Sequence, residues 1–143
     1  MKRTLVIIAL SLGLLAAFYP ERSTLDVQRL ANAVAKEQDH VTANELAQWM
    51  HEHKPGLRII DLRSANEYAK FHLTGAIRIP IETLPSQKFS QNDTLILISD
   101  AGGHAAQAWV FLQALGYRNV YFLRGGIDEW IERDQREFRR RGC

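Results

Sequence analysis

Residues 60–80 decide the fold, and they read Ile60-Asp-Leu-Arg-Ser-Ala-Asn-Glu-Tyr-Ala-Lys-Phe-His-Leu-Thr-Gly-Ala-Ile-Arg-Ile-Pro80. The apolar run 57–60 predicts a short buried strand that leads into this stretch. Residues 64–67, Ser-Ala-Asn-Glu, have the form of a capping box and predict a short helix. Residues 76–79, stopped by Pro80, predict the next strand. The stretch therefore indicates a strand, a helix and a second strand.

The rest of the chain continues this alternation. A second capping box, Thr42-Ala-Asn-Glu45, starts a helix that ends at Pro55-Gly56. Apolar spacing predicts the other elements, which are strands at 94–98 and 119–123 and helices at 105–115 and 126–133. Strands that alternate with helices form parallel βαβ units. We therefore expect an α/β fold, an open parallel sheet with helices on both faces.

Two segments resemble the signatures of the rhodanese family. In the first, a strand ends in Asp-x-Arg, a Glu-Tyr pair opens a short helix, and His-x-x-Gly-Ala-x-x-x-Pro leads into the next strand. The second is a strand, a Gly-Gly turn and a tryptophan helix at 120–130. The matching positions are Asp61, Arg63, Glu67, Tyr68, His72, Gly75, Ala76 and Pro80, followed by Gly125, Gly126 and Trp130. The resemblance covers residues 41–133 and implies a rhodanese-like domain.

The motif residues also have structural roles. We expect Asp61 and Arg63 to pair and to tie a strand end to its loops. Gly75 and the Gly125-Gly126 pair suit positive φ at turns. His72 is expected to be a hydrogen-bonded structural histidine, and no histidine spacing favours a zinc site.

The active-site loop of rhodanese-like enzymes begins with a cysteine, and here that position is a serine. The family pattern is cysteine, two residues, glycine, one residue, then commonly arginine. The resemblance implies that N–H groups of this loop surround the reactive sulfur. The degenerate loop consists of Ser99, Asp100, Ala101, Gly102, Gly103 and His104, so that Ser99 replaces cysteine and His104 stands where arginine is common.

This replacement changes the expected chemistry, because an aliphatic alcohol cannot carry a sulfane sulfur as a thiolate can. We therefore expect a pseudoenzyme: a non-catalytic binding or scaffolding module without cofactor or metal, whose protein partner is unknown. Gly102 and Gly103 leave a weak anion site open, although Asp100 opposes it. Alternatively, Asp100 or Ser99 caps the following helix.

Two other enzyme classes are disfavoured. A serine nucleophile needs a base, and His104 has no acid at a matching spacing to orient it. The related cell-cycle dual-specificity phosphatases have cysteine, five residues, then arginine, whereas position 105 is alanine.

The single cysteine, Cys143, is the last residue printed. Because a disulfide within one chain needs two cysteines, this count excludes an intramolecular disulfide. The alternative function is a sulfurtransferase that acts through this thiol, and pairing between two chains is a further possibility.

The amino-terminal segment resembles a signal or an anchor, because Lys2 and Arg3 precede the uncharged residues 4–19. We favour a retained anchor over cleavage. In a bacterium the positive-inside rule then places an inner-membrane-anchored domain on the periplasmic side, or a secreted periplasmic domain after cleavage.

Composition agrees with one domain. The net charge of +2 gives no reason to expect nucleic-acid binding. The predicted division is an anchor or signal at 1–20, an amphipathic linker helix at 21–40, the domain at 41–133 and a basic tail at 134–143.

Overall fold

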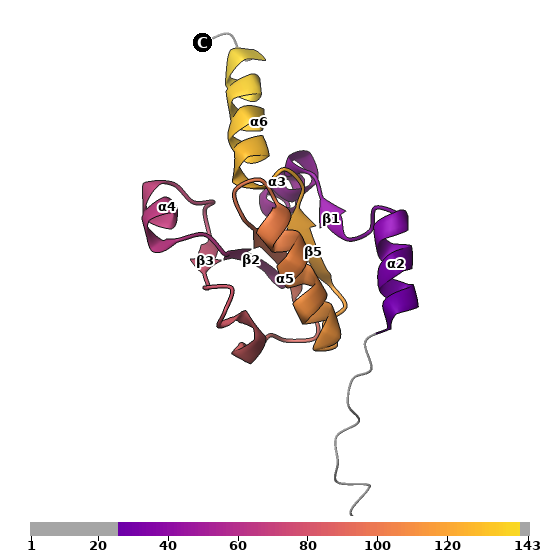
Figure 1. Cartoon of the computed structure of the whole chain (residues 1–143). Coiled ribbons are helices and arrows are strands. Elements are labelled where there is room, and N and C mark those ends of the chain that lie inside the picture. Colours follow the sequence, from indigo (N-terminus) through magenta and orange to yellow (C-terminus); the bar gives the residue numbers. More distant parts are fainter. Residues whose placement is uncertain (1–25, 141–143) are drawn as a thin grey trace, which may run out of the picture.

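A computed structural model describes residues 26–140. Its centre is a five-stranded sheet in the order β1-β5-β4-β2-β3, and all neighbouring strands are parallel (Figure 1). The strands are β1 (His40–Val41), β2 (Leu57–Asp61), β3 (Ala76–Arg78), β4 (Thr94–Ile98) and β5 (Val120–Leu123). The predicted α/β fold with an open parallel sheet is confirmed.

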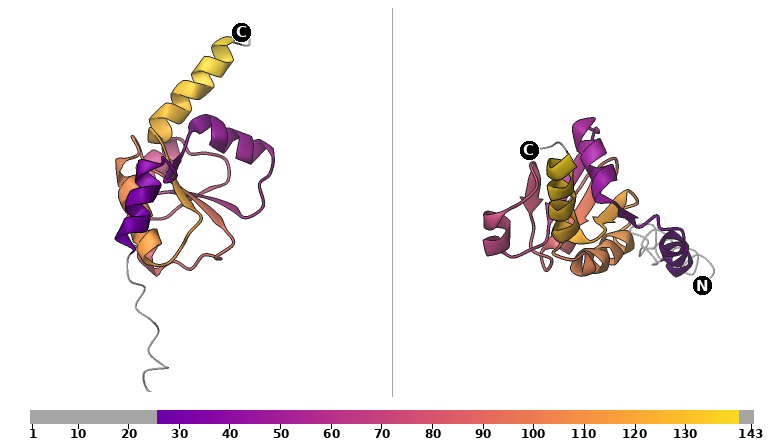
Figure 2. Two further views of the ribbon diagram at one scale, coloured as in Figure 1. Left: turned by 90° about the vertical axis from the view of Figure 1, so that its right-hand side faces the viewer. Right: turned by 90° about the horizontal axis from the view of Figure 1, so that it is seen from above.

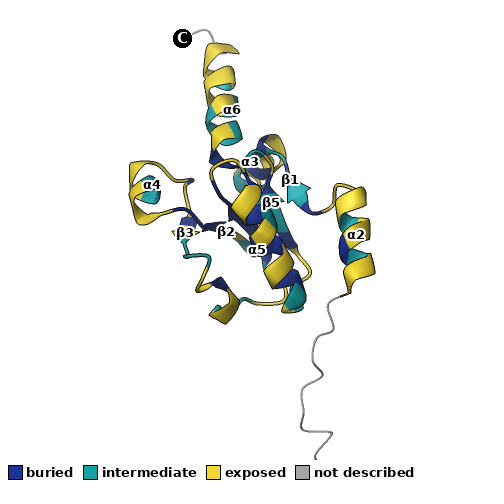
Figure 3. Ribbon diagram, viewed as in Figure 1, coloured by how far each residue is buried: buried dark blue, intermediate teal, exposed yellow. Residues whose placement is uncertain are grey.

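Helices cover both faces of the sheet, as the view from above shows (Figure 2). They are α2 (Val27–Ala35), α3 (Ala43–His51), α4 (Ala65–Lys70), α5 (Gly103–Ala114) and α6 (Gly126–Arg140), with a short 3₁₀ helix η1 at Leu84–Ser86. The buried strand β4 sends Leu95 and Leu97 toward α2, α5 and η1. Its alternate residues Ile96 and Ile98 belong to the layer with α3 and the start of α6. Figure 3 shows that the central strands are largely buried, whereas the outer sides of the helices are exposed. This period of two divides the core into two apolar layers.

Both predicted capping boxes are present. The Thr42 hydroxyl accepts from the Glu45 N–H, while the Glu45 carboxylate accepts from the Thr42 N–H. Ser64 and Glu67 repeat this arrangement at the start of α4. Each box satisfies N–H groups that a helix cannot pair internally, which is why the two helices begin where the sequence predicts.

The structure also differs from the sequence prediction. The last helix does not end at Arg133 but continues to Arg140, so most of the expected basic tail is helical. Ion pairs from Arg136 to Glu129 and Glu132 lie along this extension. The short elements β1 and η1 were not predicted, because two or three residues carry no periodic signal.

The predicted membrane segment at 4–19 lies outside the described residues. Among residues 26–140, no helix combines the length and apolar character needed to cross a bilayer. The amphipathic segment predicted before the domain forms α2, which packs on the domain through the buried Leu30.

Candidate active-site loop

The loop between β4 and α5 lies at the point where the chain changes direction across the sheet. The connection after β2 runs to β3 at one edge, whereas the connection after β4 runs to β5 on the other side. The carboxyl ends of β2 and β4 are therefore neighbours whose loops diverge. In open parallel sheets such a divergence forms the ligand-binding crevice. The loop 99–102 and the residues after Asp61 lie at this divergence.

Ser99 lies at the bottom of the loop and is only 4% exposed. Its Oγ accepts a hydrogen bond of 3.2 Å from the N–H of Ala105, in the first turn of α5. Its carbonyl accepts from the N–H of Ile127 at 2.9 Å, which ties the loop to the start of α6. The side chain of residue 99 is thus directed at the positive end of α5.

Successive N–H groups line the loop. Among the hydrogen bonds within the described chain, none has the N–H of residues 100–104 as donor. These N–H groups precede or open α5, where the helix offers them no acceptor. Consecutive unpaired N–H groups next to a helix N-terminus form an anion-binding concavity. The loop therefore retains the donors that a bound anion would need.

Two glycines allow the backbone of the loop to follow this path. Gly102 has φ of +88°, and a Cβ there would lie 3.2 Å from the carbonyl oxygen of Leu123. At Gly126, with φ of +60°, a Cβ would overlap the carbonyl oxygens of Ser99 and Asp100. The loop is consequently packed backbone to backbone against the Gly-Gly turn.

Asp61 and Arg63 form a buried ion pair beside the loop. Arg63 donates to Asp61 at 2.6 Å and to the carbonyl of Phe71 at 2.7 Å. The hydrogen bond that Arg63 donates to Asp61 raises the pKa of Arg63, and the charges of Asp61 and Asp100 add to this effect. Asp61 balances the charge of Arg63, and Asp100 and Arg78 add one charge of each sign nearby.

The remaining motif residues stabilise neighbouring turns. His72 stacks on Tyr68 at 4.0 Å, and its Nδ1 lies 2.8 Å from the Tyr68 carbonyl. Gly75 has φ of +79° at the turn before β3. Trp130 on α6 is half-buried and packs against the second core layer. Glu67 serves the capping box of α4.

His104 is exposed, and no hydrogen bond joins it to Ser99 in the described part of the chain.

The sequence did not predict the contact of Arg78, whose Nε donates to the Arg63 carbonyl at 2.9 Å. It also missed a small cleft between α3 and α6, lined by Arg124, Arg133 and Arg136. Arg133 and Arg136 are three residues apart, but the predicted helix ended at Arg133, so the sequence did not place Arg136 on the same helix.

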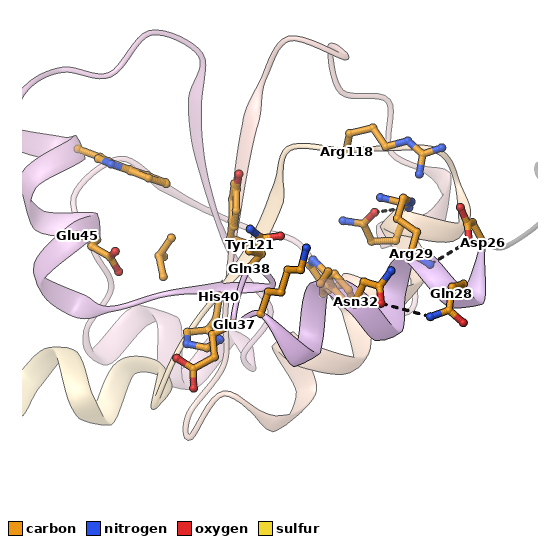
Figure 4. A pocket seen from close by; sticks show the side chains of 16 residues that line it. Asp26, Gln28, Arg29, Asn32, Glu37, Gln38, His40, Glu45, Arg118 and Tyr121 are labelled. Carbon is orange, nitrogen blue, oxygen red and sulfur yellow. Dashed lines mark hydrogen bonds between the residues drawn. The ribbon is translucent and has the colours of Figure 1, made fainter.

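A second hollow, of about 700 Å³, lies between α2 and the domain (Figure 4). Arg29, Arg118 and Tyr121 are among its lining residues, and none of residues 99–104 is. It is separate from the loop.

Unpaired N–H groups at the divergence point of a parallel sheet are the arrangement that anion-binding loops use. The rhodanese-like domain family matches residues 42–133, which is more than half of the chain. The chain belongs to the rhodanese-like domain family.

Curated relatives agree with this membership. A thiosulfate sulfurtransferase GlpE from Shewanella oneidensis is 31% identical over 65% of this chain and 92% of its own length. The GlpE from Tolumonas auensis is 30% identical over 53% of this chain and 74% of its own length. A tRNA uridine(34) hydroxylase from Buchnera aphidicola is 29% identical, but the chain spans only 27% of that protein.

Solved structures show the same fold. The human single-domain sulfurtransferase TSTD1 has 25% identity and a TM-score of 0.60, covering 66% of this chain and 96% of that one. The protein SSP1007 from Staphylococcus saprophyticus has 31% identity and a TM-score of 0.58, covering 64% and 92%.

These relatives correct one expectation. We expected no enzyme, and the relatives named thiosulfate sulfurtransferases overturn that expectation. We expected no enzyme because residues 99, 100 and 104 depart from the family pattern, but the loop backbone supplies its N–H groups whatever these side chains are.

Proposed function

We propose that this protein transfers sulfane sulfur from a thiosulfate-like donor to a thiolate acceptor at the loop 99–104. The unpaired N–H groups of this loop carry the proposal, since they suit the oxyanion end of such a donor. The names of the relatives support the same reaction class.

Ser99 does not serve as the sulfur carrier, so the acceptor attacks the bound donor directly. The acceptor thiolate forms a bond to the sulfane sulfur of thiosulfate, and the S–S bond of thiosulfate breaks. Sulfite leaves with the electron pair, and the acceptor becomes a persulfide. Loop N–H groups hold the sulfonate oxygens throughout, where charge increases on the departing sulfite.

A second candidate uses Cys143 as the carrier, because it is the only thiol in the sequence. Cys143 lies outside the described residues. The helix α6 leads from Gly126 beside the loop to Arg140, a distance of about 21 Å at roughly 1.5 Å per residue. This separation favours direct attack over transfer within one chain.

The test measures sulfite release from thiosulfate with glutathione as acceptor, using the full chain. We expect release above the uncatalysed rate, and equal release from Cys143→Ser. A rate equal to that of buffer would overturn the proposal. Loss of activity only in Cys143→Ser would overturn direct attack and favour the second candidate.

We further propose that residues 1–20 tether the protein to a membrane, with the domain on the periplasmic side in a bacterium. Two basic residues, Lys2 and Arg3, precede the uncharged residues 4–19, and this pattern supports the placement. Retention in the membrane fraction after alkaline washing, with an intact amino terminus by mass measurement, is the expected result. A cleaved protein in the soluble fraction would contradict the tether.

A further inference from the structure

A small cleft of about 140 Å³ lies between the start of α3 and the first part of α6, and we call it the α3–α6 cleft. Three arginines line it, Arg124, Arg133 and Arg136, against one acidic residue, Glu129. The lining therefore carries an excess of positive charge, and an excess of this kind concentrates anions.

The three arginines differ in how their charge is compensated. Arg136 pairs with Glu129 at 2.9 Å and with Glu132 at 3.3 Å, both on the same helix. Arg124 and Arg133 take part in none of the ion pairs within residues 26–140. The cleft thus presents two guanidinium groups that no carboxylate of the described chain contacts.

Contacts between the two helices fix the position of Arg133. Its Nε donates to Asn44 Oδ1 at 2.9 Å, and its guanidinium lies 5.4 Å from the ring centre of Trp130. Among the hydrogen bonds of the described chain, none uses the terminal nitrogens of Arg133 or a side-chain nitrogen of Arg124. A guanidinium held through Nε keeps a planar pair of donors that suits a carboxylate.

The acidic side chains near the cleft already have donors of their own. Glu129 is bound by Arg136, and Glu45 accepts from the N–H and the hydroxyl of Thr42. Glu45 interacts electrostatically with Arg124 but forms no ion pair with it in the described chain. An added carboxylate would therefore meet donors that these acids do not occupy.

The Gly-Gly turn joins the cleft to the candidate active-site loop. Arg124 directly precedes this turn, so the Cα atoms of Arg124 and Gly126 are at most about 7.6 Å apart. Gly126 packs in turn against the carbonyl oxygens of Ser99 and Asp100. Three extended peptide residues span about 10 Å. A short peptide that lies across the turn can therefore contact both the cleft and the loop.

We infer that the α3–α6 cleft binds a carboxylate of the sulfur acceptor, which makes the acceptor a small acidic thiol of the glutathione type. This inference rests on the proposed sulfur transfer. Arg124 and Arg133 hold the carboxylate, while the thiol of the same molecule lies at the loop 99–104. The two arginines bind the acceptor and take no part in the bonds that form and break.

The test compares glutathione with 2-mercaptoethanol, an uncharged thiol, as acceptors in sulfite release from thiosulfate by the full chain. Arg124→Gln removes one of the unpaired charges. The matched control is Arg139→Gln, which removes the same charge from an exposed position on α6 outside the cleft. We expect Arg124→Gln to lower the ratio of kcat/KM for glutathione to kcat/KM for 2-mercaptoethanol by about threefold or more. Arg139→Gln should preserve the ratio.

A second measurement tests the cleft without turnover. Calorimetry with S-methylglutathione, which has no free thiol, should show weaker binding to Arg124→Gln than to Arg139→Gln. Equal binding to the two variants, or an unchanged ratio of kcat/KM in Arg124→Gln, would overturn the inference and leave sulfur transfer standing. A wild type that releases no sulfite with either thiol would overturn the proposed function, and calorimetry would then still test whether the cleft binds a carboxylate.

Discussion

At position 99 the side-chain atom that points toward α5 is an oxygen, and its environment suits a thiolate. The N–H of Ala105 donates to Ser99 Oγ at 3.2 Å, and the side chain is buried. The same N–H and the helix terminus would stabilise a sulfur anion in that place. The backbone around position 99 therefore offers the same hydrogen-bond donor to either side chain.

Ser99→Cys should therefore acquire a thiol with a pKa below the ordinary value of about 8.5. In a Cys143→Ser background, the pH dependence of alkylation measures this pKa. The wild type supplies the control, since Cys143 is its only thiol. We also expect this variant to gain thiosulfate-to-cyanide transfer. A thiol pKa at or above the ordinary value would contradict the environment described for the loop.

Gly126 is required because the loop carbonyls lie where its Cβ would be. Gly126→Ala should lower the free energy of unfolding by more than about 2 kcal/mol, from combined overlap and positive φ. Gly75→Ala is the matched control, since Gly75 has φ of +79° and open space around it. It should cost about 1 kcal/mol. Equal costs in chemical denaturation would show that the overlap is relieved cheaply.

The sequence could predict which residues surround the loop, but not how the loop is used. Asp61, Arg63, Gly125 and Gly126 all lie at the carboxyl edge, as the resemblance implied. The unpaired N–H groups could not be predicted, because any residue except proline carries one and only the backbone path determines its partner.

Among the elements, α3 depends most clearly on its cap. The N–H of Thr42, and then its hydroxyl, donate to the Glu45 carboxylate and lower the pKa of Glu45 below its ordinary 4.5. A lowered pKa means that the folded state favours the charged carboxylate. This contribution is present above pH 4.5 and is lost as the pH falls through the lowered pKa.

Thr42→Ala should accordingly cost about 1 kcal/mol of unfolding free energy at neutral pH. The difference between variant and wild type should shrink below the lowered pKa of Glu45. Urea denaturation at neutral and acidic pH measures both values. A difference that stays constant with pH would show that the carboxylate takes no part in the cap.

The elements differ in how well sequence predicts them. Strand β4 agreed with its predicted range, because the β-branched Thr94 leads into four consecutive apolar residues, 95–98, that end at Ser99. The helix α6 was predicted too short, since its apolar stripe weakens after Ile131 while charge pairs accompany the helix further. Charge pairs along a helix give a weaker sequence pattern than the apolar spacing that burial produces.

At the scale of the whole molecule, the candidate loop lies between the start of α5 and the start of α6. The loop also lies beside Gly126, so the start of α6 borders the site while its end projects away from the domain (Figure 1).

The central claim is that the N–H groups of the loop hold the anionic donor. Gly103 tests it directly, because a Cβ there meets nothing within 4 Å. The measurement is the rate of sulfite release from thiosulfate and glutathione by Gly103→Asp and Gly103→Asn, which differ in one charge and little in shape. We predict that the aspartate variant is slower than the asparagine variant by about tenfold or more, through repulsion of the donor. Equal rates in the two variants would contradict the claim.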